Sequence, residues 1–198
     1  MRLPSTAHTS RPWRIHGIAP DFRVEDVWAL PTPGGPDDLP HLVGQFTEGE
    51  EPGMAGSSFA YRTLFAVRRR LGRLLHLDDA DGGVGGRVAS LRDRLPADLL
   101  AAPRGPDSDA LPFRSVYLLH DEWAAELANR TVHAVLHLGW VPDGAGGYRG
   151  QMAVLVKPNG LLGAAYLLGI KPFRYVVVYP GLLRSIGRRW QETAGRRK

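Results

Sequence analysis

The sequence contains no cysteine among its 198 residues. Disulfide bonds are therefore excluded, and so are a thiolate nucleophile, a thiolate-ligated zinc site and an iron–sulfur cluster. The composition is otherwise that of an ordinary globular protein, with 43% hydrophobic and 23% charged residues. A stable core must come from apolar burial alone, and the length fits one domain, which we predict to span residues 12–194 between flexible termini at 1–11 and 195–198.

Long hydrophobic runs are also missing. The two most apolar stretches, Gly160 to Ile170 and Tyr175 to Leu183, contain 11 and 9 residues and are separated by Lys171 and Arg174. A transmembrane helix needs about 20 continuous apolar residues, so neither stretch is predicted to span a membrane. The N-terminal residues MRLPSTAHTSRPW lack the apolar segment of a secretory signal, and we expect a cytoplasmic protein.

The sequence has none of the common catalytic motifs. It contains neither the G-x-S-x-G of many hydrolases nor the H-E-x-x-H of zinc proteases. The glycine-rich stretch from Asp78 to Gly86 lacks the lysine and hydroxyl of a phosphate-binding loop, and Val88 replaces the last glycine of a dinucleotide fingerprint. No cofactor is expected, and no reaction is predicted.

The net charge of +5 comes from the C-terminal end, where six basic residues and one acid follow Leu183. We interpret this segment as the solvated end of a helix, where cations are favourable. The alternative is weak contact with a membrane surface. Nucleic-acid binding is not expected. The basic residues are Arg184, Arg188, Arg189, Arg196, Arg197 and Lys198.

The first half of the chain contains extended and helical signals in turn. Residues Pro12 to Leu30 are interpreted as a strand, a turn and a second extended segment. The spacing of apolar residues predicts two helices, from Pro36 to Phe46 and from Ser57 to His76. Short helical turns are predicted between Ser90 and Leu100.

The second half predicts an antiparallel sheet followed by a helix. Four extended segments are joined by short turns, which favour antiparallel neighbours. The second segment has the weakest strand signal because W-A-A-E-L-A contains good helix formers. Beyond the sheet, a long helix is expected to be kinked at Pro172 and to continue its apolar face through Ile186 and Trp190. The four segments are Phe113 to Leu119, Trp123 to Ala128, Thr131 to Val141 and Tyr148 to Lys157.

The stretch from Asn129 to Pro142 has the clearest strand pattern. One face carries Leu136, Leu138 and Trp140, and the other carries His133 and His137. Four residues of a strand span about 13 Å, too far for two imidazoles to share one metal ion. No metal site is therefore predicted. Satisfied structural histidines are the preferred interpretation, and binding of a ligand is the alternative.

Acidic residues precede this strand. Glu122 and Glu126 would share a face, but we interpret them, with Asp121, as turn and surface residues. If the protein is an enzyme, the candidate general acids and bases are His133, His137 and Glu126.

The whole pattern predicts an α+β fold in which a curved antiparallel sheet carries a long kinked C-terminal helix, with two helices nearer the N-terminus. A helix packed on a curved sheet in this way favours an apolar cavity between the two. The expected function is binding of a small hydrophobic molecule. Acid/base chemistry of a cyclase or isomerase type in the same cavity is one alternative, and a membrane-surface or protein-interaction module using the basic helix is another. The predicted lining residues are Trp28, Tyr117, His133, His137, Trp140, Tyr166 and Phe173.

Three segments carry a family resemblance. They are DFRVEDVWALP from Asp21, LLHDEWAAELANRTVHAVLHLGWV from Leu118, and KPNGLLGAAYLLGIKPFRYVVVYPGLLRSIGRRW from Lys157. They resemble the bacterial domain-of-unknown-function 2867 family, which also occurs joined to short-chain-dehydrogenase-like reductases. This sequence has no reductase half, so no dinucleotide activity is implied. The order of elements resembles the helix-grip architecture of the START and pollen-allergen (SRPBCC) superfamily, which implies a hydrophobic-ligand binder without transferable catalytic residues.

Overall fold

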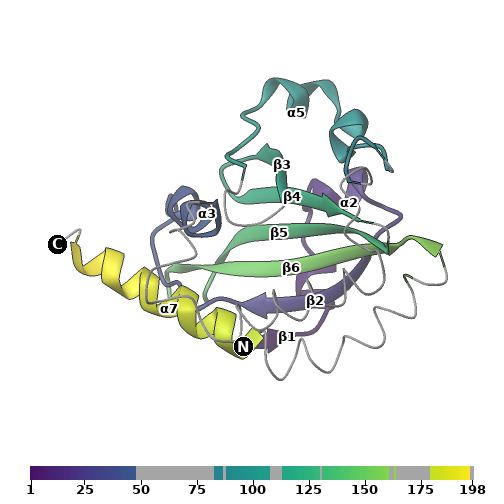
Figure 1. Ribbon diagram of the computed structural model, residues 1–198. Helices are drawn as coiled ribbons and strands as arrows, with labels where there is room; N and C mark the ends of the chain where they lie inside the picture. The colour runs from purple at the N-terminus through teal and green to yellow at the C-terminus, as the bar shows by residue number, and fades with distance from the viewer. Residues whose placement is uncertain are drawn as a thin grey trace, which may run out of the picture.

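A computed structural model describes residues 1–47, 83–86, 88–107, 113–129, 131–160, 163 and 179–196 (Figure 1). Its centre is a six-stranded antiparallel sheet in the order β1-β2-β6-β5-β4-β3. The strands are β1 (Arg2–Leu3), β2 (Arg23–Ala29), β3 (Arg114–Leu118), β4 (Glu122–Ala128), β5 (Val132–Pro142) and β6 (Tyr148–Pro158). The predicted meander is thus confirmed, and β2 pairs with its last strand.

Strand β5 lies inside the sheet between β4 and β6. It pairs with β6 along its whole length, from Val132 opposite Pro158 to Pro142 opposite Tyr148. On its other edge it pairs with β4, the segment with the weakest strand signal. Backbone pairing with two neighbours and burial of both faces override the helix propensity of that segment.

Two helices have more than eight residues in the described part of the chain. They are α3 (Leu39–Thr47), which confirms the helix predicted after Pro36, and the C-terminal α7 (Tyr179–Arg196). The predicted helix at Ser57 to His76 and the predicted kink at Pro172 lie outside the described residues. None of the described helices is long and apolar enough to cross a bilayer.

The short helical elements lie on the N-terminal and central segments. They are α1 (Thr6–Thr9), α2 (Ile15–Ile18), the 3-10 helix η1 (Leu91–Arg94) and α5 (Ala97–Ala101). The last two confirm the turns predicted between Ser90 and Leu100. The strand predicted to begin near Pro12 is wrong, because this segment forms α2. Ile15 and Ile18 are both buried, and helical spacing places both on one side, where a strand would separate them.

The sheet has two covered faces. Val135, Ala124 and Leu155 pack with Ile15 and Leu91 on the face that α1, α2, η1 and α5 cover. We name this the histidine face, since His133 and His137 point to it and alternate along β5 with residues that point to the opposite face. Figure 1 shows α2 and α7 on opposite sides of the sheet.

The opposite face meets α3 and α7. Leu136, Leu138 and Trp140 pack there with Ile186 and Trp190 of α7. We name it the aromatic face. The burial of Ile186 and Trp190 confirms the predicted apolar side of the C-terminal helix. The strand from Thr131 to Val141 thus presents its leucines and Trp140 to that helix, and its histidines to the N-terminal segment.

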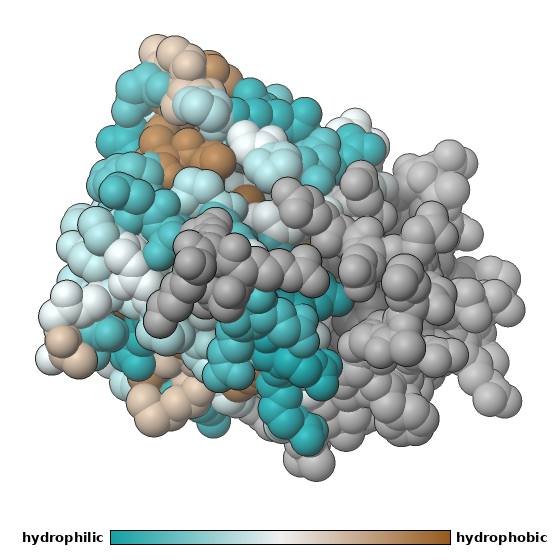
Figure 2. Space-filling model, turned by 90° about the vertical axis from the view of Figure 1, so that its left-hand side faces the viewer, coloured by the Kyte–Doolittle hydropathy of each residue, from teal (hydrophilic) through white to brown (hydrophobic). Residues whose placement is uncertain are grey.

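Apolar side chains are largely enclosed by this arrangement. Figure 2 shows hydrophobic residues only in small, separate groups among hydrophilic ones on the described part of one side of the molecule. Among the described residues, the exposed large hydrophobic side chains are Met1 and Leu100. The described surface therefore gives no broad apolar area for a partner on this side.

Gly139 gives a direct test of the packing on the histidine face. A Cβ atom there would lie 2.7 Å from Cζ2 of the buried Trp13 ring. We expect Gly139→Ala to destabilise the protein by about 1–3 kcal/mol, because the ring must move. Gly17→Ala is the control, since a Cβ at Gly17 meets nothing within 4 Å. Urea unfolding of both variants measures the effect, and equal midpoints would contradict the packing of Trp13 on β5.

Candidate functional site

Two histidine–glutamate pairs lie side by side on the histidine face. Nε2 of His137 is 2.8 Å from Oε2 of Glu122, and Nε2 of His133 is 2.8 Å from Oε2 of Glu126. The two pairs have the same geometry across β4 and β5. Glu122 lies opposite Gly139 and Glu126 opposite Val135, so each histidine is two residues before the position that faces its glutamate. All four side chains are at least 96% buried.

The placement of both glutamates corrects a sequence prediction. Glu122 and Glu126 were expected to be solvated turn residues. They are buried because β4 is an inner strand and its even-numbered residues point to the histidine face, which the N-terminal and central helical elements cover. A carboxylate in that position needs hydrogen-bond donors, and the structure supplies several to each.

Glu122 receives three kinds of donor. The Tyr117 hydroxyl donates to Oε2 at 3.0 Å, the Arg14 backbone N–H donates to Oε1 at 2.9 Å, and His137 binds Oε2. Burial raises the pKa of Glu122, but the bond and charge of His137, with the other two donors, outweigh it and leave that pKa below its ordinary value. Burial and the Glu122 charge raise the pKa of Tyr117. The carboxylate is thus ionised and the phenol neutral at neutral pH.

His8 of α1 extends this chain of hydrogen bonds. Its Nε2 is 3.2 Å from Nδ1 of His137, and the two rings meet edge to face with centroids 4.9 Å apart. Burial, followed by the nearby His137 and His16, lowers the pKa of His8 to about 2. His8 is therefore neutral at neutral pH.

The two imidazoles share one hydrogen bond. Ionised Glu122 accepts from Nε2 of His137, and Nδ1 of His137 is joined to Nε2 of His8. Nδ1 of His8 is buried and has no hydrogen-bond partner.

Two other buried polar atoms near α1 lack partners. They are Nε1 of Trp13 and Oε1 of Gln151. The Trp13 ring lies 6.3 Å from the His8 ring, and Nε2 of Gln151 donates to the carbonyl of Ala7. With Nδ1 of His8, three buried polar atoms around α1 are thus without partners.

Glu126 anchors the 3-10 helix η1 to the sheet. Its carboxylate accepts from the Ser90 hydroxyl at 2.5 Å and from the Leu91 N–H at 3.0 Å. Burial raises the pKa of Glu126, but His133, Ser90 and Leu91 outweigh burial and lower it. The Phe22 ring covers His133 edge to face at 4.9 Å. Each group of this pair has a partner in the fold.

The aromatic face also contains a buried carboxylate. Asp26 is 2% exposed, and its Oδ2 accepts from the Tyr179 hydroxyl at 2.6 Å. The Tyr179 ring lies 4.7 Å from the Trp28 ring, and the rings of Trp140 and Trp190 are 5.8 Å apart. Aromatic rings with few polar groups are typical of sites for apolar ligands.

The predicted lining residues do not share one face. Trp28 and Trp140 lie on the aromatic face, while Tyr117, His133 and His137 lie on the histidine face. Tyr166 and Phe173 lie outside the described residues.

Four residues of these clusters were missed by the sequence analysis, namely His8, Trp13, Asp26 and Tyr179. The equal spacing of E-x3-E on β4 and H-x3-H on β5 was a usable signal for the two pairs. No local sequence pattern indicates the role of His8, which lies 129 positions before its partner His137.

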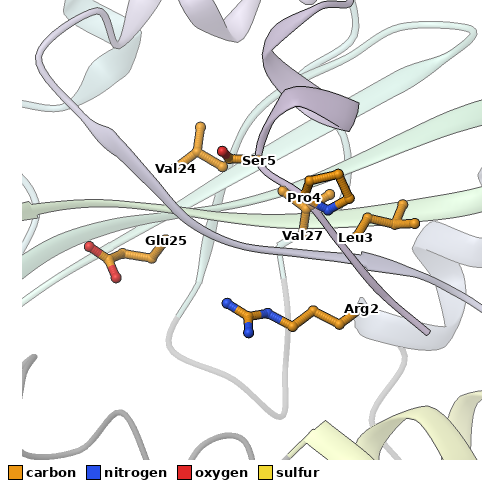
Figure 3. A pocket seen from close by; sticks show the side chains of 7 residues that line it. All are labelled: Arg2, Leu3, Pro4, Ser5, Val24, Glu25 and Val27. Carbon is orange, nitrogen blue, oxygen red and sulfur yellow. The ribbon is translucent and has the colours of Figure 1, made fainter.

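A surface hollow lies at the sheet edge formed by β1 and β2. Its volume is about 380 Å³ (Figure 3). The side chains of Arg2 and Glu25 extend to one side of β2, and those of Val24 and Ser5 to the other. The hollow contains none of the buried histidines or glutamates. Its lining residues are Arg2, Leu3, Pro4, Ser5, Val24, Glu25 and Val27.

Two further sequence predictions concern metals and the basic tail. Within the described ranges, no group of three or more histidine and acidic residues could hold a metal ion. Arg184 and Arg188 are exposed one turn apart on α7, and Arg189 is half-buried. The side chains of Arg196, Arg197 and Lys198 are outside the described part.

The comparison with known families gives one match. The family described as Protein of unknown function (DUF2867) matches residues 18–181, which include strands β2 to β6 and the start of α7. The chain belongs to this family. No curated protein and no solved structure matches it.

Proposed function

For this member of the DUF2867 family, we propose binding of a small hydrophobic molecule between the aromatic face of the sheet and the C-terminal helix, in a helix-grip arrangement on a curved sheet. The observation that carries the proposal is the buried Asp26–Tyr179 pair beside the Trp28 ring. Such a pair provides a polar anchor within apolar walls, which is the usual chemistry of a site for an apolar ligand with one polar group.

The surroundings of this pair support the same conclusion. Trp140 and Trp190 each donate their indole N–H to a backbone carbonyl, that of Gly35 and that of Pro33, at 2.8 and 2.9 Å. Their polar atoms are thus satisfied inside the fold, and the rings present apolar surface. Asp26 and Tyr179 hydrogen-bond to each other on this face, while the two histidine–glutamate pairs lie on the other face. The aromatic face is therefore suited to binding rather than to acid/base chemistry.

Titration of the purified protein with the neutral apolar dye N-phenyl-1-naphthylamine tests the proposal. We expect saturable fluorescence enhancement at one dye per chain, and native mass spectrometry should detect the dye as a 1:1 complex. Trp28→Leu should weaken binding about tenfold, because the stacking surface beside Tyr179 is lost. Trp13→Phe, on the opposite face, is the matched control and should bind as the wild type does. Absence of saturable binding, or equal losses in both variants, would overturn the proposal.

Acid/base chemistry is the second candidate, and the Glu122–His137–His8 chain favours it. The chain ends at the buried, unpartnered Nδ1 of His8, whose ring lies 6.3 Å from the Trp13 ring. A substrate hydroxyl bound there could give its proton to Nδ1 of His8. His133 and Glu126 are less suited, since Ser90, Leu91 and Phe22 enclose them. Loss of a measured activity in His8→Gln, with unchanged dye binding, would favour this function over the first.

A further inference from the structure

Residues Pro4 to Ile18 form a cap on the histidine face, and we name this segment the N-terminal cap. It follows the short strand β1, and its own elements α1 and α2 add no strand to the sheet. Three contacts with the sheet involve hydrogen bonds, from His8 to His137, from the Arg14 N–H to Glu122, and from Gln151 to the Ala7 carbonyl. The Trp13 ring covers Gly139 and lies 5.2 Å from the His137 ring.

The contact between His8 and His137 depends on an uncharged His8. His8 is fully buried against a second imidazole, and a third, His16, lies edge to face at 4.8 Å. Nδ1 of His8 has no hydrogen-bond partner among the described residues, so a second proton on this ring would add a buried charge without one. A charged imidazole in this position would be desolvated without a partner, which is among the costliest arrangements in a protein interior.

The other groups around His8 do not offer it a countercharge. Glu122 is the nearest carboxylate in this chain of contacts, and it already forms hydrogen bonds with His137, Tyr117 and the Arg14 N–H. Gln151 of β6 is uncharged. Two cations of the cap itself add positive charge: the Arg11 guanidinium lies 5.8 Å from the Trp13 ring centre, and the Arg14 side chain pairs with Asp98 of α5. Protonation of His8 is therefore unfavourable while the cap is closed.

We propose that the N-terminal cap is an acid-released cover that exposes the Glu122–His137 pair when His8 leaves Nδ1 of His137. The released His8 gains a solvated site for its proton, and Nδ1 of His137 becomes accessible to solvent and solutes. This inference concerns the histidine face and goes beyond the proposed ligand site on the aromatic face.

The sign of the pH effect follows from the two states of His8. A solvated histidine has a pKa of about 6.5, whereas burial in the closed cap lowers the pKa of His8 to about 2. Above about pH 6.5 both states are neutral and the cap is most stable. Below it the open state binds a proton that the closed state excludes, so the opening constant rises about tenfold per pH unit. Between pH 7.5 and 4.5 the expected rise is about 100-fold.

Amide hydrogen exchange of the full chain, corrected for the intrinsic pH dependence of exchange, tests this proposal. In the wild type, protection of the amides of α1 and α2 should fall about 100-fold between pH 7.5 and 4.5, while protection of β5 persists. His8→Gln places a neutral amide donor near Nδ1 of His137 and should reduce the change to less than about threefold. His120→Gln is the matched control, because the His120 side chain is 90% exposed, and it should retain the wild-type response.

Covalent labelling of histidines with diethyl pyrocarbonate at pH 6.0 gives an independent readout. His133 is the internal reference, since it lies on the same strand and face as His137 but contacts Phe22 and Glu126 outside the cap. Local release labels His137 and leaves His133 protected. Equal labelling of both, joint loss of protection in the cap and β5, or an unchanged pH response in His8→Gln would each overturn the proposal.

Discussion

Replacing Glu122 with leucine is expected to lower the free energy of unfolding by about 3–5 kcal/mol, the range for breaking a buried charged network from one side. The change leaves the Tyr117 hydroxyl and the Arg14 N–H without their acceptor inside the protein. It also removes the charge that fixes Nε2 of His137 as the donor. Urea unfolding monitored by far-UV circular dichroism measures the loss.

A matched control separates the loss of hydrogen bonds and charge from the loss of side-chain shape. Glu122→Gln keeps one carbonyl acceptor and should cost roughly half as much, because a neutral oxygen binds the same donors more weakly. In Tyr117→Phe/Glu122→Leu one of the orphaned donors is removed, so the double variant should be less damaged than the sum of the single changes. Additive single-variant losses would show that the two side chains act independently.

Lowering the pH is expected to destabilise the protein in two separate windows. The first begins below about pH 6.5, where solvated His8 binds a proton that the folded state excludes, and it costs up to about 1.4 kcal/mol per pH unit. The free energy of cap opening limits this loss, since an open cap accepts the proton without further unfolding.

The second window belongs to the two glutamates. Their hydrogen bonds lower the pKa values of Glu122 and Glu126 in the fold, so their contribution is complete above the ordinary glutamate value of about 4.5 and is lost as the pH falls below it. Urea midpoints measured from pH 8 to 3 should therefore fall gently first and then more steeply. His8→Gln should remove the first window and retain the second. A midpoint independent of pH between 8 and 5 in the wild type would contradict the burial of a neutral His8.

The strand pattern of β5 was fully readable in the sequence, because alternation on a two-faced strand is a local property. The same alternation excluded a metal between His133 and His137. The pattern did not show which segments of the chain cover each face of the sheet. His8 reaches His137 across 129 positions of sequence, and such a contact depends on how the cap packs rather than on any spacing within it.

Local propensity was a poor guide in two other segments. The strand β4 has a helix-like composition, yet pairing with β3 and β5 makes it extended. The segment near Pro12 looked extended, yet burial of Ile15 and Ile18 on one side makes it helical. The β4 segment was nevertheless predicted as a strand. The error there concerned Glu122 and Glu126, since an exposed turn and an inner strand place the same carboxylates in opposite environments.

The five tryptophans provide a small set of NMR signals with which the proposed binding face can be tested. Trp28, Trp140 and Trp190 lie on the aromatic face, and Trp13 lies on the histidine face. Trp123 also packs on the aromatic face, where its indole donates to the Ser115 hydroxyl of β3. Each contributes one indole N–H resonance to a 15N NMR spectrum, and single Trp→Phe variants assign them.

Titration of the labelled protein with N-phenyl-1-naphthylamine at pH 7.5 is the most direct test of a ligand site between sheet and C-terminal helix. We predict that the Trp28, Trp140 and Trp190 signals shift together and saturate at one dye per chain, while the Trp13 signal stays in place. Shifts confined to Trp13, or no saturable shift in any of the five signals, would contradict it.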